Sequence, residues 1–466
     1  MAATTAAAAC VQVIAPSPLG ATAIAALRAR GIEARLAETP DPSEFVAWAL
    51  ETTPTGTAAV ELASACARAA EAGRPVCLLA PPPQRGGRAG TERAAALAYL
   101  RAHGAALTHD VDAWLEAVVL LVRHGLPRGP RAAVIAPAGS WLEAQALLIA
   151  AEAESLNTRP PVIGPRTETT DEPTDVVLYD PSLGAPSPTM PGLHVPIAAR
   201  GELATDPAAL HGARASLTAI TMLGRAAERI AVGLGPAPRT ASAELAIDGE
   251  KLQRQLGKLG PGRLGDHETK VLLSAYGVAI TRQAVATTPS AAVKLARRAG
   301  YPVELKPWGH DLPTEPAGCP VERGVSSDAL TRQAFGAVLA AAGKTSAEGA
   351  AVIVRETPPA GREVSVSLRE LPALGWTVLL DAPGTGQLAA PAPLRLIDAQ
   401  GLAAQVAASR AGDPEPDRAG LANLLRRVSH LAADLGERLE RLDLPRVVVG
   451  GRGARTLVID AFAELA

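Results

Sequence analysis

A repeated pattern near the start of the chain constrains its fold more than any other sequence feature. Residues 11–36 and 131–156 each hold the tetrapeptide VIAP, then a turn of small residues, then a run rich in Ala and Leu. A short apolar run, a tight turn and a helical pattern together form the opening strand–helix unit of a parallel sheet. Further apolar runs follow, at 75–80 and 175–181. We therefore predict two doubly wound α/β domains, with one larger sheet as the alternative.

Segments rich in Pro, Gly and polar residues divide the chain. They lie at 124–131 and at 233–244, where such a composition favours connectors over helices or strands. The predicted organisation is a first α/β domain over residues 1–126, a second over 127–238, a linker over 239–254 and a third domain over 255–466.

The third domain has a different pattern of predicted helices and strands from the first two. The run HETKVLLSAYG has helical spacing and ends at Gly277, a residue suited to a helix end. Residues 362–370, REVSVSLRE, alternate like a half-buried antiparallel strand. A long helical run at about 419–441 precedes a turn at 450–453 and a closing strand. These patterns predict an α+β domain with several antiparallel strands.

Composition narrows the class of protein. The chain has 466 residues, of which 48% are hydrophobic and only 3% aromatic, so its cores must be packed mainly by Ala, Val, Leu and Ile. A net charge of −2 argues against a nucleic-acid or anionic-membrane surface. The four cysteines are scattered, which favours free, mostly buried thiols. We predict a soluble cytoplasmic protein without a signal peptide.

Several ordered motifs in the third domain resemble those of one family. They occupy residues 268–278, 300–306, 352–356 with 361–363, 423–442 and 458–461. In this order they resemble the ATP-grasp domain of NDP-forming acyl-CoA synthetases, relatives of succinyl-CoA ligase. The resemblance implies an ADP-forming acid–CoA ligase with a pair of flavodoxin-like domains before the grasp domain. It also implies ATP and Mg²⁺ as cofactors. The family's CoA-binding domain is expected either to come from a partner chain or to be lost, because the first α/β domain starts at about residue 10. The expected partners are a CoA-binding subunit or, in a homo-oligomer, further copies of the chain.

The resemblance also assigns roles to individual residues. Lys306 stands at the position of the lysine that neutralises phosphate charge; a solvated lysine at a strand end is the alternative. Glu356 and Glu363 stand where the family binds the nucleotide, and Asp460 where it binds Mg²⁺; ordinary surface or turn carboxylates are the alternatives. The second metal ligand of the family, an asparagine, is replaced by Pro445, which offers no side-chain donor.

The stretch APPPQRGGRAG at residues 80–90 bears on catalysis. A Gly-rich turn before a helix can hold a phosphate, and in the family this frame carries a histidine that is phosphorylated. Here Arg88 fills the histidine slot. A guanidinium stays protonated and has no free lone pair, so it cannot accept the phosphoryl group. His103 and His109, beyond the next helix, are the candidates for a relocated carrier.

The sequence thus predicts an acyl-CoA-synthetase-like ATP-grasp protein with impaired or lost phosphohistidine chemistry, a possible pseudoenzyme. Three alternatives stay open. The chain could be a non-catalytic nucleotide-binding or scaffold subunit. It could be an active acid–CoA ligase that needs a separate CoA-binding subunit. It could also use a direct acyl-phosphate route without a phosphohistidine.

Overall fold

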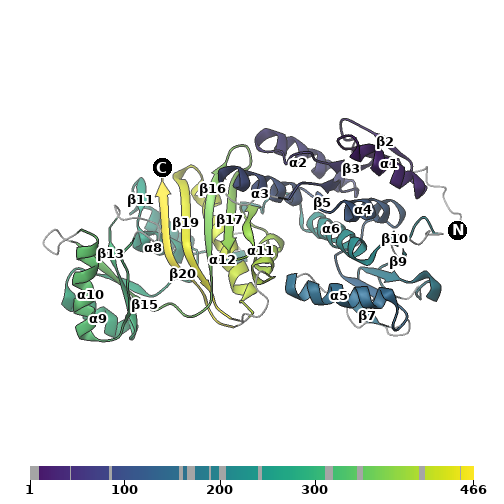
Figure 1. Ribbon diagram of the computed structural model, residues 1–466. Helices are drawn as coiled ribbons and strands as arrows, with labels where there is room; N and C mark the ends of the chain where they lie inside the picture. Colours follow the sequence, from purple (N-terminus) through teal and green to yellow (C-terminus); the bar gives the residue numbers. More distant parts are fainter. Residues whose placement is uncertain are drawn as a thin grey trace. The chain divides into compact units, whose positions relative to one another are not determined.

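The chain divides into two compact units, seen in the ribbon of Figure 1. One unit comprises residues 1–235 and 372–374, and the other comprises residues 236–371 and 375–466. The computed structural model describes residues 10–41, 43–82, 87–156, 161–164, 174–187, 190–198, 206–239, 244–309, 319–343, 350–408, 415–451 and 453–466.

The first unit opens with a five-stranded parallel sheet in the order β2-β1-β3-β4-β5. Its strands are β1 (Val11–Ile14), β2 (Ala34–Leu36), β3 (Phe45–Ala49), β4 (Cys77–Leu79) and β5 (Ala106–Thr108). Its helices are α1 (Leu19–Ala29), α2 (Gly56–Glu71), α3 (Gly87–Ala102) and α4 (Val111–Arg123). The short apolar runs of the sequence become buried strands, because helices cover the sheet.

A second parallel sheet follows in the order β10-β9-β8-β6-β7. Its strands are β6 (Ala132–Ile135), β7 (Val162–Gly164), β8 (Val176–Tyr179), β9 (Leu193–Ala198) and β10 (Leu210–His211). It is accompanied by α5 (Trp141–Leu156), a short 3₁₀ helix (Pro181–Leu183) and α6 (Ala213–Val232). Counted from its own first strand, each sheet has the order 2-1-3-4-5.

The repeat in the sequence therefore produces two separate sheets, and the prediction of two parallel α/β sheets is confirmed. The two sheets share one apolar cluster built mainly from Ala, Val, Leu and Ile, to which α4 and α6 contribute. The indole of Trp114 in α4 is fully buried and donates from Nε1 to the Cys77 carbonyl at 2.8 Å. The boundary between the two predicted domains remains a prediction, because the core is continuous across it.

The second unit contains a six-stranded antiparallel sheet in the order β11-β20-β19-β16-β17-β18. Its strands are β11 (Gly262–Leu264), β16 (Arg362–Leu371), β17 (Gly375–Ala382), β18 (Gly386–Pro391), β19 (Leu439–Val449) and β20 (Thr456–Leu465). The associated helices are α7 (Gly249–Leu256), α8 (Asp266–Ala275), α11 (Leu396–Ala408) and α12 (Arg418–Leu435). Strand β16 alternates buried and partly exposed residues as predicted, because α12 packs on one face of the sheet.

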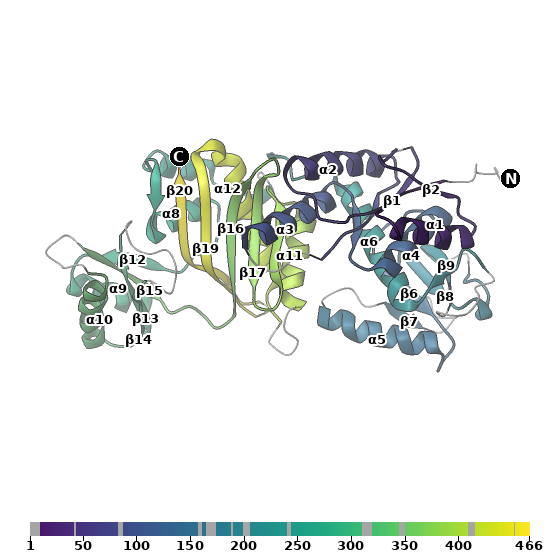
Figure 2. The same cartoon turned by 45° about the horizontal axis from the view of Figure 1, so that its top comes forward.

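A smaller four-stranded sheet in the same unit has the order β12-β15-β13-β14. Its strands are β12 (Gln283–Ala286), β13 (Val303–Trp308), β14 (Glu322–Val325) and β15 (Ala351–Glu356). Figure 2 shows α9 (Pro289–Ala299) and α10 (Asp328–Ala341) beside this sheet. Helix α9 begins as the sequence suggests, since the Thr288 hydroxyl accepts the Ala291 amide at 3.1 Å.

Two local expectations were wrong. The predicted helix over 419–441 ends at Leu435, where Gly436 takes a φ of +54° that favours glycine; residues 439–449 form β19 instead. The predicted Gly-rich turn is helical from Gly87, so residues 87–90 are the first turn of α3. Gly86 lies outside the described residues.

All four cysteines are unpaired, and Cys66 and Cys77 are buried. Burial raises the pKa of both buried thiols to about 12, which makes them unreactive packing groups. No helix in the described part of the chain is long and apolar enough to cross a membrane.

Candidate functional site: a buried ionic centre

Two of the predicted site residues meet in the second unit. Lys306 of β13 donates from Nζ to Oδ1 of Asp460 on β20 at 2.7 Å. The two residues are 154 positions apart in sequence, and they link the small sheet to the large one. Lys306 is buried, so it is not the solvated strand-end lysine of the alternative interpretation.

Arg355 is the second cation at Asp460. Its Nη1 lies 2.7 Å from Oδ1 of Asp460 and also donates to the Ile459 carbonyl at 2.9 Å. Its Nε and Nη2 donate to Oε2 of Glu304 at 2.9 and 2.7 Å. The Glu304–Arg355 pair follows from the sheet register, because these residues lie directly opposite each other on β13 and β15.

Asp266 and Lys270, one turn apart on α8, complete the centre. Oδ2 of Asp266 lies 3.0 Å from Nζ of Lys306 and 3.2 Å from Nζ of Lys270. Its Oδ1 accepts the Ala461 amide at 2.9 Å. Lys270 also donates to Thr281, Gln283 and the Ile459 carbonyl, at 2.9, 2.7 and 2.6 Å. A helix, two sheets and six charged side chains therefore form one bonded group, which we call the ionic centre: Asp266, Lys270, Glu304, Lys306, Arg355 and Asp460.

Burial and neighbouring charges set the protonation of the centre. Burial by itself would raise the pKa of Asp460, but the charges of Lys306 and Arg355 outweigh it and hold that pKa well below its usual range. The same balance, with Lys270 and Lys306 as the cations, lowers the pKa of Asp266. Burial lowers the pKa of Lys270 to about 7, against the opposing charge of Asp266. Asp266 and Asp460 are therefore ionised near neutral pH, as their hydrogen bonds require.

The other predicted nucleotide-binding residues lie away from these contacts. Glu356 ends β15, where it accepts the Arg282 amide at 2.9 Å and the Arg282 guanidinium at 2.7 Å. Glu363 on β16 accepts two bonds from Arg446, at 2.9 and 2.7 Å. Both carboxylates are thus paired with arginines, of which Arg282 is exposed and Arg446 largely buried, and neither carboxylate has a bond to Lys306 or Asp460.

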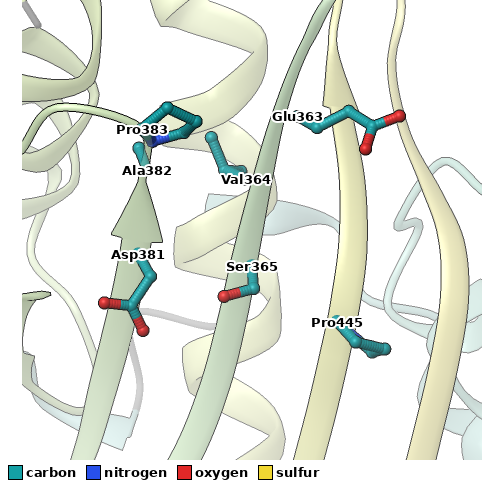
Figure 3. Close-up of a pocket in the computed structure, with 7 residues that line it drawn as sticks. All are labelled: Glu363, Val364, Ser365, Asp381, Ala382, Pro383 and Pro445. Atoms are coloured by element: carbon teal, nitrogen blue, oxygen red, sulfur yellow. The ribbon is translucent and has the colours of Figure 1, made fainter. Parts of the chain in front are cut away.

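Glu363 and Pro445 line an open hollow of about 230 Å³ on the large sheet (Figure 3). Ser365 of β16 and Asp381 of β17 line it as well. Pro445 stands where the register of β19 shifts against both of its neighbouring strands. A proline has no N–H for the ladder, so it is confined to such irregular positions in a sheet. The position therefore supplies a bend in the strand and no metal ligand.

Arg88 and the two candidate replacement histidines lie in the first unit. The Arg88 side chain is 86% exposed and pairs with Glu92, one turn along α3, at 2.9 Å. His109 follows β5, and its Nδ1 lies 2.7 Å from the Ala80 carbonyl, at the start of the stretch that carries Arg88. His103 directly follows α3, with its Nδ1 2.8 Å from the Tyr99 carbonyl. Burial lowers the pKa of both imidazoles.

The ionic centre does not fit a divalent cation in its present arrangement. Mg²⁺ prefers six oxygen ligands at about 2.0–2.1 Å. Here Oδ1 of Asp460 already accepts bonds from two cations, and both oxygens of Asp266 are occupied. Within the described residues, no group of three or more His, Cys, Asp or Glu side chains could hold a metal ion.

Sequence reasoning located Lys306 and Asp460 but missed their partners Asp266, Lys270, Glu304 and Arg355. A signal was present, since Glu304 and Arg355 interrupt otherwise apolar strands and Lys270 interrupts an apolar helix face. A charged side chain at such a position must find an opposite charge when the element is buried. The sequence does not say which charge it finds.

Comparison with known proteins agrees with this fold. Residues 257–465 match a family described as an ATP-grasp domain. The acetate–CoA ligase [ADP-forming] II subunit beta of Pyrococcus furiosus is 25% identical over 230 residues, which cover 46% of this chain and 98% of that protein. The 4-hydroxybutyrate–CoA ligase [ADP-forming] of Nitrosopumilus maritimus is 25% identical over 227 residues, which cover 45% of this chain and 32% of that protein.

Solved structures of similar sequence have low overall superposition scores. An acetyl-coenzyme A synthetase 1 from Ca. Korarchaeum cryptofilum, solved in complex with coenzyme A, is 23% identical with a TM-score of 0.40, covering 46% of this chain and 98% of that one. The sequence matches show that residues 257–465 form an ATP-grasp domain, and that this part of the chain is homologous to the ATP-grasp part of ADP-forming acyl-CoA synthetases.

Proposed function

We propose that this chain is an acyl-CoA-synthetase-like ATP-grasp protein in which the phosphohistidine relay no longer operates. The observation that carries the proposal is Arg88, which fills the carrier slot in the first turn of α3 and pairs there with Glu92. The relay needs a side-chain nitrogen with a free lone pair. A guanidinium offers none at any pH at which the protein folds.

Other features of the chain, namely its two parallel sheets and the residues proposed to contact nucleotide, support descent from this family. Both α/β sheets of the first unit have the strand order 2-1-3-4-5, which is that of flavodoxin-like domains. Lys306 is assigned to the phosphate position, and Glu356 and Glu363 are proposed as nucleotide contacts once Arg282 and Arg446 release them. A CoA-binding partner subunit would supply the site for CoA, and the cytoplasm is the proposed compartment.

Phosphoryl labelling tests the proposal directly. Purified full-length protein is incubated with γ-³²P-ATP and Mg²⁺, and acid-labile, base-stable phosphate on the chain is measured. We expect no label on the wild-type protein. A labelled wild-type chain would overturn the proposal, and a His109→Asn variant that lost the label would place the carrier at His109, beside Ala80.

The Arg88→His variant gives the matched comparison. It restores an imidazole at an exposed position, where the substitution costs little stability. If this variant becomes labelled, Arg88 alone blocks the relay, and the rest of the phosphohistidine machinery is intact. No label would show that the machinery is lost elsewhere as well.

A non-catalytic nucleotide-binding or scaffold subunit is the second candidate, and the bonded state of Lys306 favours it. Nζ of Lys306 is already held by Asp460 and Asp266. Thermal denaturation with and without Mg-ATP separates the two forms of this candidate. Nucleotide at 100-fold over its Kd adds about 2.7 kcal/mol to the free energy of unfolding. No shift at millimolar nucleotide would leave a scaffold without a nucleotide site.

A further inference from the structure

We infer that the Asp460 position has exchanged a divalent cation for two fixed cations, the Lys306 ammonium and the Arg355 guanidinium. In this arrangement the protein neutralises Asp460 with its own side chains and takes no metal ion there. The inference goes beyond the proposed function, which concerns the carrier at Arg88 in the other unit. It rests on the contacts, the charge balance and the burial of the ionic centre.

The contacts at Asp460 place both cations on one of its two carboxylate oxygens. One oxygen, Oδ1, lies 2.7 Å from Lys306 Nζ and 2.7 Å from Arg355 Nη1. These are charge-assisted hydrogen bonds, which are the strongest kind that a carboxylate accepts. A metal ion on this oxygen would have to displace both donors, or approach two positive charges in a weakly screening interior.

Charge balance points the same way. The ionic centre holds three acidic side chains, of Asp266, Glu304 and Asp460, and three basic ones, of Lys270, Lys306 and Arg355. The most exposed of these side chains, that of Asp460, is only 13% accessible. Asp460 is already paired with two basic side chains, Lys306 and Arg355. The two further positive charges of a metal ion would therefore have no carboxylate of their own in this buried group. The described part of the chain also offers Pro445 where the resemblance places the second metal ligand.

The fixed cations also determine what the centre joins. Lys306 and Arg355 belong to the small sheet, and Asp460 belongs to the large one. Their bonds therefore connect the two sheets of the ATP-grasp domain through protein groups alone. A contact of this kind does not depend on the concentration of divalent ions, so the centre keeps its arrangement whether or not Mg²⁺ is present.

Manganese binding tests this inference. Mn²⁺ is titrated into the full-length wild-type protein and the Asp460→Asn variant, and free Mn²⁺ is counted from its electron paramagnetic resonance signal. The titration is done with and without β,γ-methylene-ATP, so that a metal carried by a nucleotide is included. We expect the same number of bound Mn²⁺ ions per chain for both proteins in each condition. The Asp381→Asn variant controls for binding in the open hollow of the large sheet.

The result that would overturn the inference is the loss of one bound Mn²⁺ per chain in Asp460→Asn, in either condition. Mn²⁺ ions that the wild-type protein and Asp460→Asn bind in equal number do not bind at Asp460, and this result supports the inference. If Asp460→Asn does not fold, Fe²⁺-directed oxidative cleavage of the wild-type chain replaces it: cleavage within β20 overturns the inference, and its absence there supports it. Phosphoryl labelling is not measured here, so either result leaves the Arg88 proposal separately testable.

Discussion

Replacing Arg355 by methionine removes the cation that holds Glu304 and one of the two that hold Asp460. The Arg355 side chain is 1% exposed, and Glu304 is also buried. Among the described residues, the other cation near Glu304 is Arg323, whose Nε lies 3.8 Å from Oε1 of Glu304 and whose side chain is largely exposed. The substitution therefore leaves a buried carboxylate without a close partner. Breaking a buried pair in this way costs about 3–5 kcal/mol.

Hydrogen exchange measured by mass spectrometry gives the assay, because it reports the free energy of opening segment by segment. Each 1.4 kcal/mol corresponds to a factor of ten, so amides of β13 and β15 should exchange roughly 10²- to 10⁴-fold faster in Arg355→Met. The Arg282→Met variant is the matched control. It removes an arginine that lies one residue before β12 of the same sheet and whose side chain is 72% exposed in its pair with Glu356, and it should cost less than about 1 kcal/mol.

A double variant tests the reason for this cost. Arg355→Met combined with Glu304→Met removes the stranded carboxylate together with its partner. Paired apolar substitutions of this kind are far milder than breaking the pair. We expect the double variant to be less destabilised than the sum of the two single variants. The reasoning is refuted if Arg355→Met costs no more than Arg282→Met, or if the two single effects simply add.

Two further predictions concern the first unit. Asp110 caps α4 by accepting the Ala113 amide at 3.0 Å, so Asp110→Ala should lower the free energy of unfolding by about 1 kcal/mol in urea denaturation, and a loss of only a few tenths would contradict the cap. Burial lowers the pKa of His103 and of His211 below the usual 6.5. The unfolded chain then binds protons more readily than the folded one, so stability falls as pH drops through 6.5 towards the folded pKa values. Calorimetry should show a lower melting temperature in that window for the wild-type protein and a smaller decline for a His103→Gln, His211→Asn variant; equal declines would contradict this assignment.

The sequence by itself determined the parallel sheets of the first unit. Each VIAP run has the length and apolarity of a buried strand, and each is followed by a turn and a helical pattern. The alternation of residues 362–370 likewise predicted which face of β16 is buried. These features depend on neighbours a few residues apart, so a local pattern is sufficient to predict them. The motifs around Lys306 and Asp460 could be found in the sequence for the same reason, since each is a short local pattern.

Helix α12 shows where a prediction from local sequence was too long: the predicted helix extended to residue 441, but α12 ends at Leu435. Residues 436–441 continue a helical composition, but they form a 3₁₀ turn and the start of β19. Strand β19 pairs with β16 and β20 over most of its length. Those ladder bonds come from strands that are distant in sequence, and they override the weak helical preference of the segment.

Only the tertiary structure decided how the charges of the ionic centre are paired. Register on the small sheet sets Glu304 opposite Arg355, but Lys306 and Arg355 reach Asp460 across 154 and 105 residues of sequence. A buried charge requires a counter-charge, and a sequence states that requirement without naming the partner. The packing of the two sheets supplies the partner, and so turns the carboxylate expected to bind a metal into one held by the protein's own cations.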